Sequence, residues 1–159
     1  MDIRSEIERV IKENQLDRFR CFECSKNTYA AIIKKIEQTF VLHGGSIHWS
    51  NMGHGFRTEL VCRTQNVSED KMWVTKLPKI IPESEKLVYV LLEGSKNLQS
   101  KYWVYEMGIP ELICIIGEVY CLDDFYIVSK KFNWLISECH EEVVSFVGSP
   151  LNLSCFGRG

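Results

Sequence analysis

The second half of the chain contains five short runs of apolar, aromatic and β-branched residues separated by polar turns. They cover residues 86–92, 101–105, 125–129, 134–137 and 143–147. Residues of this kind favour strands. A connection as short as residues 130–133 joins antiparallel neighbours, because a parallel crossover needs a dozen residues or more. One helix, opened by Pro110, interrupts the series. The second half is therefore predicted to form an antiparallel sheet.

Helical spacing dominates the first half. Apolar residues recur every three or four positions within residues 2–14 and again from Tyr29 to Phe40, which predicts two amphipathic helices. A third, short helix is expected to begin near residues 68–70, carry Trp73 and Leu77, and stop at Pro78. A strand is expected at 58–63. The predicted fold class is α+β, with an antiparallel sheet in the C-terminal half and helices from the N-terminal half packed on one face.

Length and composition fit one globular domain over residues 1–159. The chain is 45% hydrophobic and 25% charged, a profile of a folded protein with a core of ordinary size. It holds no apolar run near the roughly 18 residues of a membrane-spanning helix. Its first 15 residues are charged and amphipathic, which is unlike a secretory signal. We therefore expect a cytoplasmic protein without a membrane partner.

The seven cysteines are expected to be reduced thiols. Their number is odd, and several lie in apolar company, where cysteine acts as a small buried hydrophobe. They are Cys21, Cys24, Cys62, Cys114, Cys121, Cys139 and Cys155. The CxxC pair of Cys21 and Cys24 lacks a second pair at zinc-site spacing. A redox role for it stays open, because the pair precedes a predicted helix. We expect no metal and no cofactor.

Histidines provide the best case for an enzyme. His43, His48 and His54 lie in a glycine-rich stretch, where imidazole can bind metals or transfer protons and glycine allows close approach to a ligand. Their spacing matches no common metal motif, and an exposed loop explains them equally well. Glu138 and His140 pair a carboxylate with an imidazole, the minimum for acid–base catalysis. No phosphate-binding loop or nucleophile motif accompanies either group.

Charge is distributed unevenly. Residues 1–80 carry 13 basic and 10 acidic side chains, whereas residues 81–159 carry 6 and 11. Between residues 102 and 129 there are five acidic side chains and no basic one, among several aromatic residues. An acidic surface repels nucleic acid and attracts a basic partner, and aromatic residues often anchor protein interfaces. The candidate partner-binding residues are Tyr102, Tyr105, Glu106, Glu111, Glu118, Asp123 and Asp124, with Trp103 and Tyr120 in the same stretch.

The segment from Asp124 to Gly148 carries a resemblance. Its sequence, DFYIVSKKFNWLISECHEEVVSFVG, resembles the closing signature of an uncharacterised family of small bacterial proteins. A similar strand–turn–Trp-strand ending occurs in toxin-immunity proteins of the SUKH class. The resemblance implies a bacterial, cytoplasmic, non-catalytic protein that neutralises a toxin. His140 matches the Glu-x-His position of the signature, but no role comes with that match. The residues themselves predict a hairpin with Tyr126 and Trp134 in the core.

Two functions follow from these observations. The favoured hypothesis is a non-catalytic protein-binding domain that uses the acidic, aromatic-bearing surface. Its more specific form is a bacterial immunity protein that neutralises a toxin domain. The alternative is a small enzyme that uses the His43, His48 and His54 loop or the Glu138 and His140 pair. A clustered acidic face would favour the first hypothesis, and a deep polar pocket lined by the histidines would favour the second.

Overall fold

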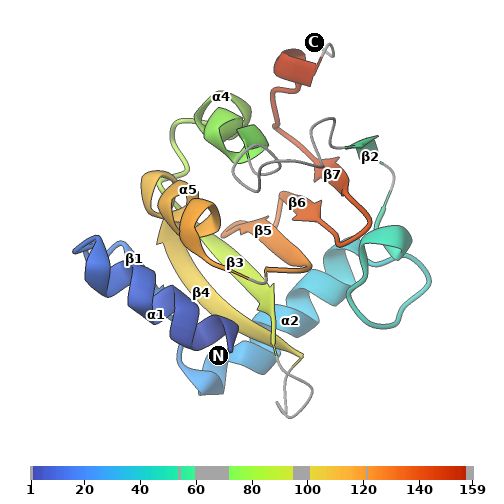
Figure 1. Ribbon diagram of the computed structural model, residues 1–159. Helices are drawn as coiled ribbons and strands as arrows, with labels where there is room; N and C mark the ends of the chain where they lie inside the picture. Colours follow the sequence, from blue (N-terminus) through green and yellow to red (C-terminus); the bar gives the residue numbers. More distant parts are fainter. Residues whose placement is uncertain (1, 54, 60–71, 95–100, 121, 157–159) are drawn as a thin grey trace.

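Seven antiparallel strands build the sheet at the centre of the molecule (Figure 1). The computed structural model describes residues 2–53, 55–59, 72–94, 101–120 and 122–156. The strands are β1 (Cys21–Glu23), β2 (Gly55–Glu59), β3 (Leu87–Glu93), β4 (Tyr102–Gly108), β5 (Phe125–Ser129), β6 (Trp134–Glu138) and β7 (Val143–Gly148). Their order across the sheet is β1-β4-β3-β5-β6-β7-β2, so both edge strands come from the first half of the chain.

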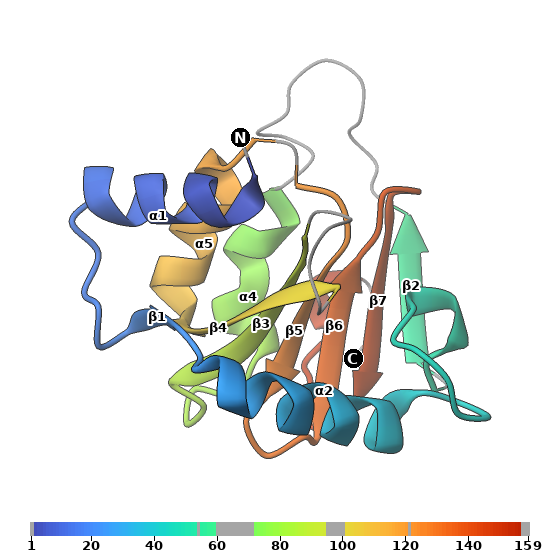
Figure 2. The ribbon, with the colours of Figure 1, turned by 90° about the horizontal axis from the view of Figure 1, so that it is seen from below.

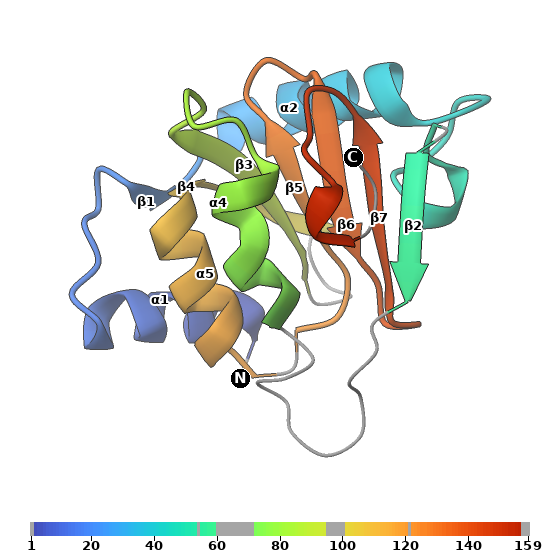
Figure 3. The ribbon, with the colours of Figure 1, turned by 90° about the horizontal axis from the view of Figure 1, so that it is seen from above.

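Helices cover both faces of this sheet. The α-helices are α1 (Ile3–Glu13), α2 (Lys26–Phe40), α4 (Leu77–Ile80) and α5 (Ile109–Glu118), and the 3-10 helices are η1 (Trp49–Asn51), η2 (Met72–Lys76) and η3 (Ser154–Phe156). In Figure 2, α2 lies alone along one face, while α1, α4 and α5 lie on the other. Figure 3 shows α4 and α5 beside each other over that second face.

Local sequence explains where α1 and α5 lie. Asp2 caps α1 by accepting a 2.7 Å hydrogen bond from the Ser5 N–H. Ile3, Ile7, Val10 and Ile11 are then buried along one stripe of the helix. In α5 the buried stripe is Leu112, Ile115 and Ile116, and α1 packs against it. These two helices thereby place their polar residues next to one another at the surface.

The central strands are buried on both faces because helices cover both. Every residue of β5 and of β6 is buried, and Trp134 and Tyr126 are almost fully excluded from solvent. Glu85 accepts 2.7 Å hydrogen bonds from the Ser129 hydroxyl and the Trp134 indole, which fixes the β5–β6 hairpin to the segment before β3. The prediction that Tyr126 and Trp134 are core residues of an antiparallel hairpin is confirmed.

The α+β fold class and the antiparallel sheet drawn mostly from the C-terminal half are confirmed. The structure adds that helices occupy both faces and that α5 comes from the second half of the chain. The prediction that a helix stops at Pro78 is wrong. Pro78 lies in the first turn of α4, where its missing N–H costs nothing, and the helix continues to Ile80. The expected strand at 58–63 corresponds to β2 only as far as Glu59, and residues 60–63 and 68–70 lie outside the described residues.

Candidate functional site

The two tyrosines predicted to bind a partner lie in the core. In β4, Tyr102 is 4% exposed and Tyr105 is fully buried. The Tyr102 hydroxyl donates to the Ile47 carbonyl oxygen, and the Tyr105 hydroxyl donates to Glu8 at 2.8 Å. β4 is paired with strands on both sides and covered on both faces, so its aromatic side chains stabilise the fold from inside.

Three of the predicted carboxylates are engaged in ion pairs in different places. Glu106 lies 2.9 Å from Lys130 and Glu111 lies 3.3 Å from Arg20. Asp124 is buried. Its Oδ1 accepts a 2.8 Å hydrogen bond from the backbone N–H of His140 and also lies 2.8 Å from His140 Nδ1. Glu106 faces the α2 side of the sheet while Glu111 belongs to α5 on the opposite side. The structure therefore does not gather these three residues on one surface.

The last two predicted residues, Glu118 and Asp123, are exposed and flank the exposed residue Tyr120 in the sequence. Tyr120 follows the end of α5 and its side chain is 70% exposed. Among the described residues, the other large hydrophobic side chains left in solvent are Phe19 and Leu42. We call Glu13, Glu118, Tyr120 and Asp123 the Tyr120 surface. A large aromatic ring with carboxylates around it is a typical anchor for a protein partner.

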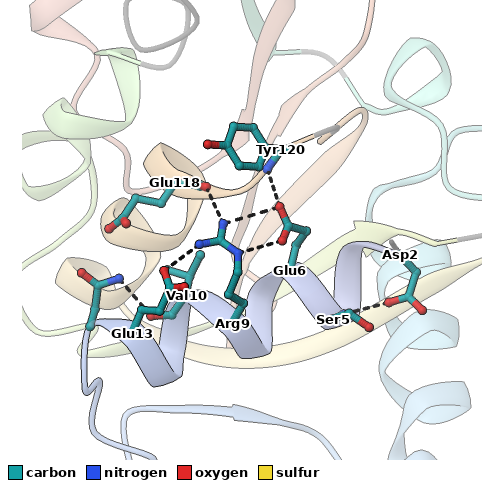
Figure 4. Close-up of polar contacts among 9 residues, drawn as sticks. Asp2, Ser5, Glu6, Arg9, Val10, Glu13, Glu118 and Tyr120 are labelled. Atoms are coloured by element: carbon teal, nitrogen blue, oxygen red, sulfur yellow. Dashed lines mark hydrogen bonds and ion pairs between the residues drawn. The ribbon is translucent and has the colours of Figure 1, made fainter.

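Two residues of α1, Glu6 and Arg9, lie next to Tyr120 (Figure 4). Its backbone N–H donates to Glu6 Oε1 at 3.4 Å, and the Arg9 guanidinium lies 5.7 Å from the centre of its ring. Glu6 is buried although it carries a charge. Contacts of this kind fix both the backbone and the ring before any partner arrives, which reduces the entropy lost on binding.

Arg9 organises the cluster. It donates to Glu6 at 2.8 Å, to Glu13 at 2.7 Å and to the Glu118 carbonyl oxygen at 3.2 Å (Figure 4). The hydrogen bond from Arg9 lowers the pKa of Glu6, and the same bond raises the pKa of Arg9. Both groups are therefore charged at neutral pH. Arg9 thus pairs with the carboxylates of Glu6 and Glu13, and the cluster keeps an excess of negative charge.

Sequence reasoning selected the neighbourhood of Tyr120 but not the arginine behind it. Tyr120 was noted among the aromatic residues of this stretch, and Glu118 and Asp123 were among the predicted binding residues. Arg9 lies more than 100 positions away in the chain, and only the packing of α1 on α5 brings it to Glu118. The available signal was the i, i+3 and i, i+4 spacing of Glu6, Arg9 and Glu13 on one face of α1.

A scan against known protein families matches residues 1–155 to a family of unknown function, DUF6756. The chain belongs to this family. No curated protein and no solved structure matches the chain. Family membership therefore supplies no activity, and any function of this DUF6756 member has to be argued from its own geometry.

The histidines of this DUF6756 member occupy separate places. His43 is exposed, and His48 contacts the Ser50 hydroxyl at 2.6 Å as it caps η1. His54 lies outside the described residues. Glu138 is buried and accepts a 2.6 Å hydrogen bond from the Trp73 indole, so the carboxylate that orients His140 is that of Asp124. This Asp124–His140 pair is the arrangement nearest to acid–base chemistry.

The described cysteines are free thiols: Cys21, Cys24, Cys114, Cys139 and Cys155. Burial raises the pKa of Cys21 to about 12 and that of Cys24 to about 11. A redox-active CxxC pair needs the opposite shift, because the thiolate is the reactive form. Cys62 and Cys121 lie outside the described residues. Within the described residues no three potential ligands gather into a metal site, and no helix has the length and apolar content to cross a membrane.

Proposed function

We propose that this chain is a non-catalytic protein-binding domain, and that the Tyr120 surface is where its partner docks. The observation that carries the proposal is Tyr120, a large aromatic side chain that is 70% exposed and yet held by Arg9 and Glu6. An exposed ring without support would lose much of its binding energy to ordering. The contacts of Tyr120 with Glu6 and Arg9 reduce that loss.

Charge indicates the class of partner. Three exposed acidic residues belong to this part of the molecule: Glu13, which pairs with Arg9, and Glu118 and Asp123, which flank Tyr120 in the sequence. Among the described residues, Arg9 is the cation that contacts both Glu13 and the Tyr120 ring. A basic protein surface is complementary to this arrangement. Charges at the rim act mostly on the association rate and on partner choice, while the buried ring supplies affinity. The resemblance of residues 124–148 to toxin-immunity proteins suggests a more specific form, in which the partner is a basic toxin domain.

Site-specific photo-crosslinking in the native host tests the proposal. A photoreactive phenylalanine derivative is placed at position 120, and at position 19 as a matched control. Phe19 is also exposed, at 88%, but lies between Arg18 and Arg20. We expect position 120 to capture a basic protein that position 19 does not capture. Identical adducts from both positions, or none from position 120, would contradict the proposal.

The captured protein is then purified and its binding measured against charge and salt. The double charge reversal Glu118→Lys and Asp123→Lys should slow association at least tenfold at low ionic strength, and 0.5 M salt should remove most of that difference. Tyr120→Ala should instead speed dissociation. A partner whose association is insensitive to salt and to these substitutions would show that it binds elsewhere.

The Asp124–His140 pair supports a second candidate, a small enzyme. The His140 side chain is 59% exposed while Asp124 is buried, so a carboxylate orients an imidazole that solvent can reach. This geometry suits a general base. Hydrolase substrate screens with the purified chain test it, with His140→Ala expected to abolish any turnover. An activity that survives in His140→Ala would remove this candidate.

A further inference from the structure

A second surface, on the opposite face of the sheet from Tyr120, carries a groove. It runs between α2 and the start of β4 and has a volume of about 580 Å³. We call it the α2–β4 groove, and its principal lining residues are Lys26, Tyr29, Ile33, Glu37, Tyr102 and Trp103. Along α2 these positions follow helical spacing, so one face of the helix forms a continuous wall. Ala30, with its small side chain, leaves the middle of this wall open.

The floor of the groove is formed by aromatic side chains that are mostly buried. Tyr29, Tyr102 and Trp103 are each less than one-tenth exposed. The Tyr29 hydroxyl donates to Glu23 and the Tyr102 hydroxyl to the Ile47 carbonyl oxygen, so both phenols are already occupied. The Trp103 indole N–H is buried without an acceptor within the described residues, a costly arrangement in a fold that could place an apolar residue there. The exposed lining of the groove is nevertheless mostly apolar, which suits apolar side chains.

Opposite charges mark the two ends of the groove. The Lys26 ammonium lies 5.2 Å from the centre of the Trp103 ring, and no described carboxylate pairs with it. Arg4 lies over the same ring at 5.5 Å, but Glu23 neutralises it at 2.8 Å. The Glu37 carboxylate, at the other end, likewise has no cation partner among the described residues, and its charge adds to the burial that raises the pKa of Tyr102. Lys101 also lines the groove; its ammonium lies 5.6 Å from the centre of the Tyr102 ring and is paired with Glu93 at 3.8 Å.

The groove on the other side of α2 differs in this respect. It is lined by Cys24, Tyr89 and Phe132, and its carboxylate, Glu106, is already paired with Lys130 at 2.9 Å. In that groove the carboxylate already has a cation partner. In the α2–β4 groove, by contrast, the Lys26 ammonium and the Glu37 carboxylate can form ion pairs with a ligand.

We infer that the α2–β4 groove binds a short extended peptide with an acidic side chain at one end and a basic side chain at the other. Eleven residues separate Lys26 from Glu37, which is about 16 Å along a helix. An extended chain covers that distance with about five residues. The acidic side chain would pair with Lys26, the basic one with Glu37, and apolar side chains between them would cover Trp103 and Tyr102. This inference does not depend on the Tyr120 surface.

The experiment uses four blocked pentapeptides and the full chain. Glu-Val-Leu-Val-Lys and Lys-Val-Leu-Val-Glu allow either chain direction, and Glu-Val-Leu-Val-Glu and Lys-Val-Leu-Val-Lys are controls of matched length and apolar content. Calorimetry measures affinity, and amide shifts in NMR spectra locate the site. We expect one of the mixed peptides to bind about fivefold more tightly than either control, the effect of one partly exposed ion pair.

The inference also predicts that charge reversal in the protein changes which of the four peptides binds most tightly. Lys26→Glu should make Lys-Val-Leu-Val-Lys the best ligand, and Glu37→Lys should favour Glu-Val-Leu-Val-Glu. Lys34→Glu, an exposed change on the same helix outside the groove, should leave the ranking unchanged. The thermal midpoint of each variant verifies folding. Equal binding of all four peptides, shifts outside the groove, or the same switch in Lys34→Glu would overturn the inference.

Discussion

His140 and Asp124 illustrate how single residues join distant parts of this chain. Asp124 opens β5 and His140 lies in the turn between β6 and β7, and two contacts to one carboxylate oxygen connect them. Asp124 is buried and His140 is exposed, so the pair forms a boundary between the core and solvent.

The first prediction concerns the titration of His140. The hydrogen bond and the charge of Asp124 raise the pKa of His140 above its ordinary 6.5, and Asp123 and Glu141 add to the effect. Because the pKa is raised in the folded state, this contribution to stability is complete below pH 6.5 and is lost as the pH rises through the folded-state pKa. An NMR titration of the imidazole should therefore show a midpoint above 6.5.

Asp124→Asn keeps an oxygen acceptor for the backbone N–H of His140 but removes the charge. Its His140 midpoint should fall back towards 6.5. A parallel series of thermal midpoints should show less loss of stability above pH 7 for His140→Ala than for the unmodified chain. An unchanged midpoint in Asp124→Asn would mean that the raised pKa has another cause.

At the scale of elements, the β5–β6–β7 meander depends on one turn and one glycine. The turn at residues 130–133 reverses the chain between β5 and β6, as its sequence predicts. Gly148 ends β7 opposite Trp134 with φ of 88°, in the left-handed region that favours glycine. A Cβ at Gly148 would collide with the Asn133 carbonyl oxygen. The backbone there cannot move away without breaking the β6–β7 pairing.

Gly148→Ala should therefore destabilise the fold, by about 1–3 kcal/mol for a non-glycine residue in a strained backbone region. Gly117→Ala is a matched control, because Gly117 lies in α5 and a Cβ there meets nothing within 4 Å. Replacing a helical glycine by alanine should stabilise the protein by about 0.5–1 kcal/mol. Urea unfolding measures both values, and equal effects of the two substitutions would contradict this explanation of Gly148.

Elements were easier to predict from the sequence than the surfaces they form. Strands β5, β6 and β7 were recognised because their runs are separated by clear turns. β1 was not predicted, since three residues are too few for a period-two pattern to appear. The segment was interpreted instead as a CxxC pair, Cys21 and Cys24. Burial of Tyr102 and Tyr105 was not predictable, because it depends on β4 being a central strand with helices packed on both faces of the sheet. Closeness in the sequence to acidic residues did not show whether an aromatic side chain is exposed.

The whole molecule presents two candidate binding surfaces on opposite faces of one sheet. Helices α1 and α5 lie on one face and α2 on the other (Figure 2). The Tyr120 surface is built on α1 and the end of α5, and α2 lines the α2–β4 groove. The two share no residue. A partner on one surface leaves the other accessible, so the chain could hold two ligands at once.

We therefore expect the two surfaces to act independently. The mixed-charge pentapeptide should bind with the same affinity, within about twofold, whether or not the crosslinked partner occupies the Tyr120 surface, because well-separated sites couple weakly. Tyr120→Ala should leave peptide affinity unchanged, and Lys26→Glu should leave partner affinity unchanged. Calorimetry on the preformed complex measures the first expectation. Competition between peptide and partner would indicate that both use one surface.

The strand order also has a consequence for how the protein is made. β1 and β2 emerge from the ribosome first, but their partners, β4 and β7, follow more than 80 residues later. At about 5–20 residues per second, synthesis delays each pairing by roughly 4–17 seconds. During that interval α1, α2 and both future edge strands exist without the sheet that will bury their apolar sides. The apolar sides of the first half of the chain therefore stay exposed until the last strands have been made.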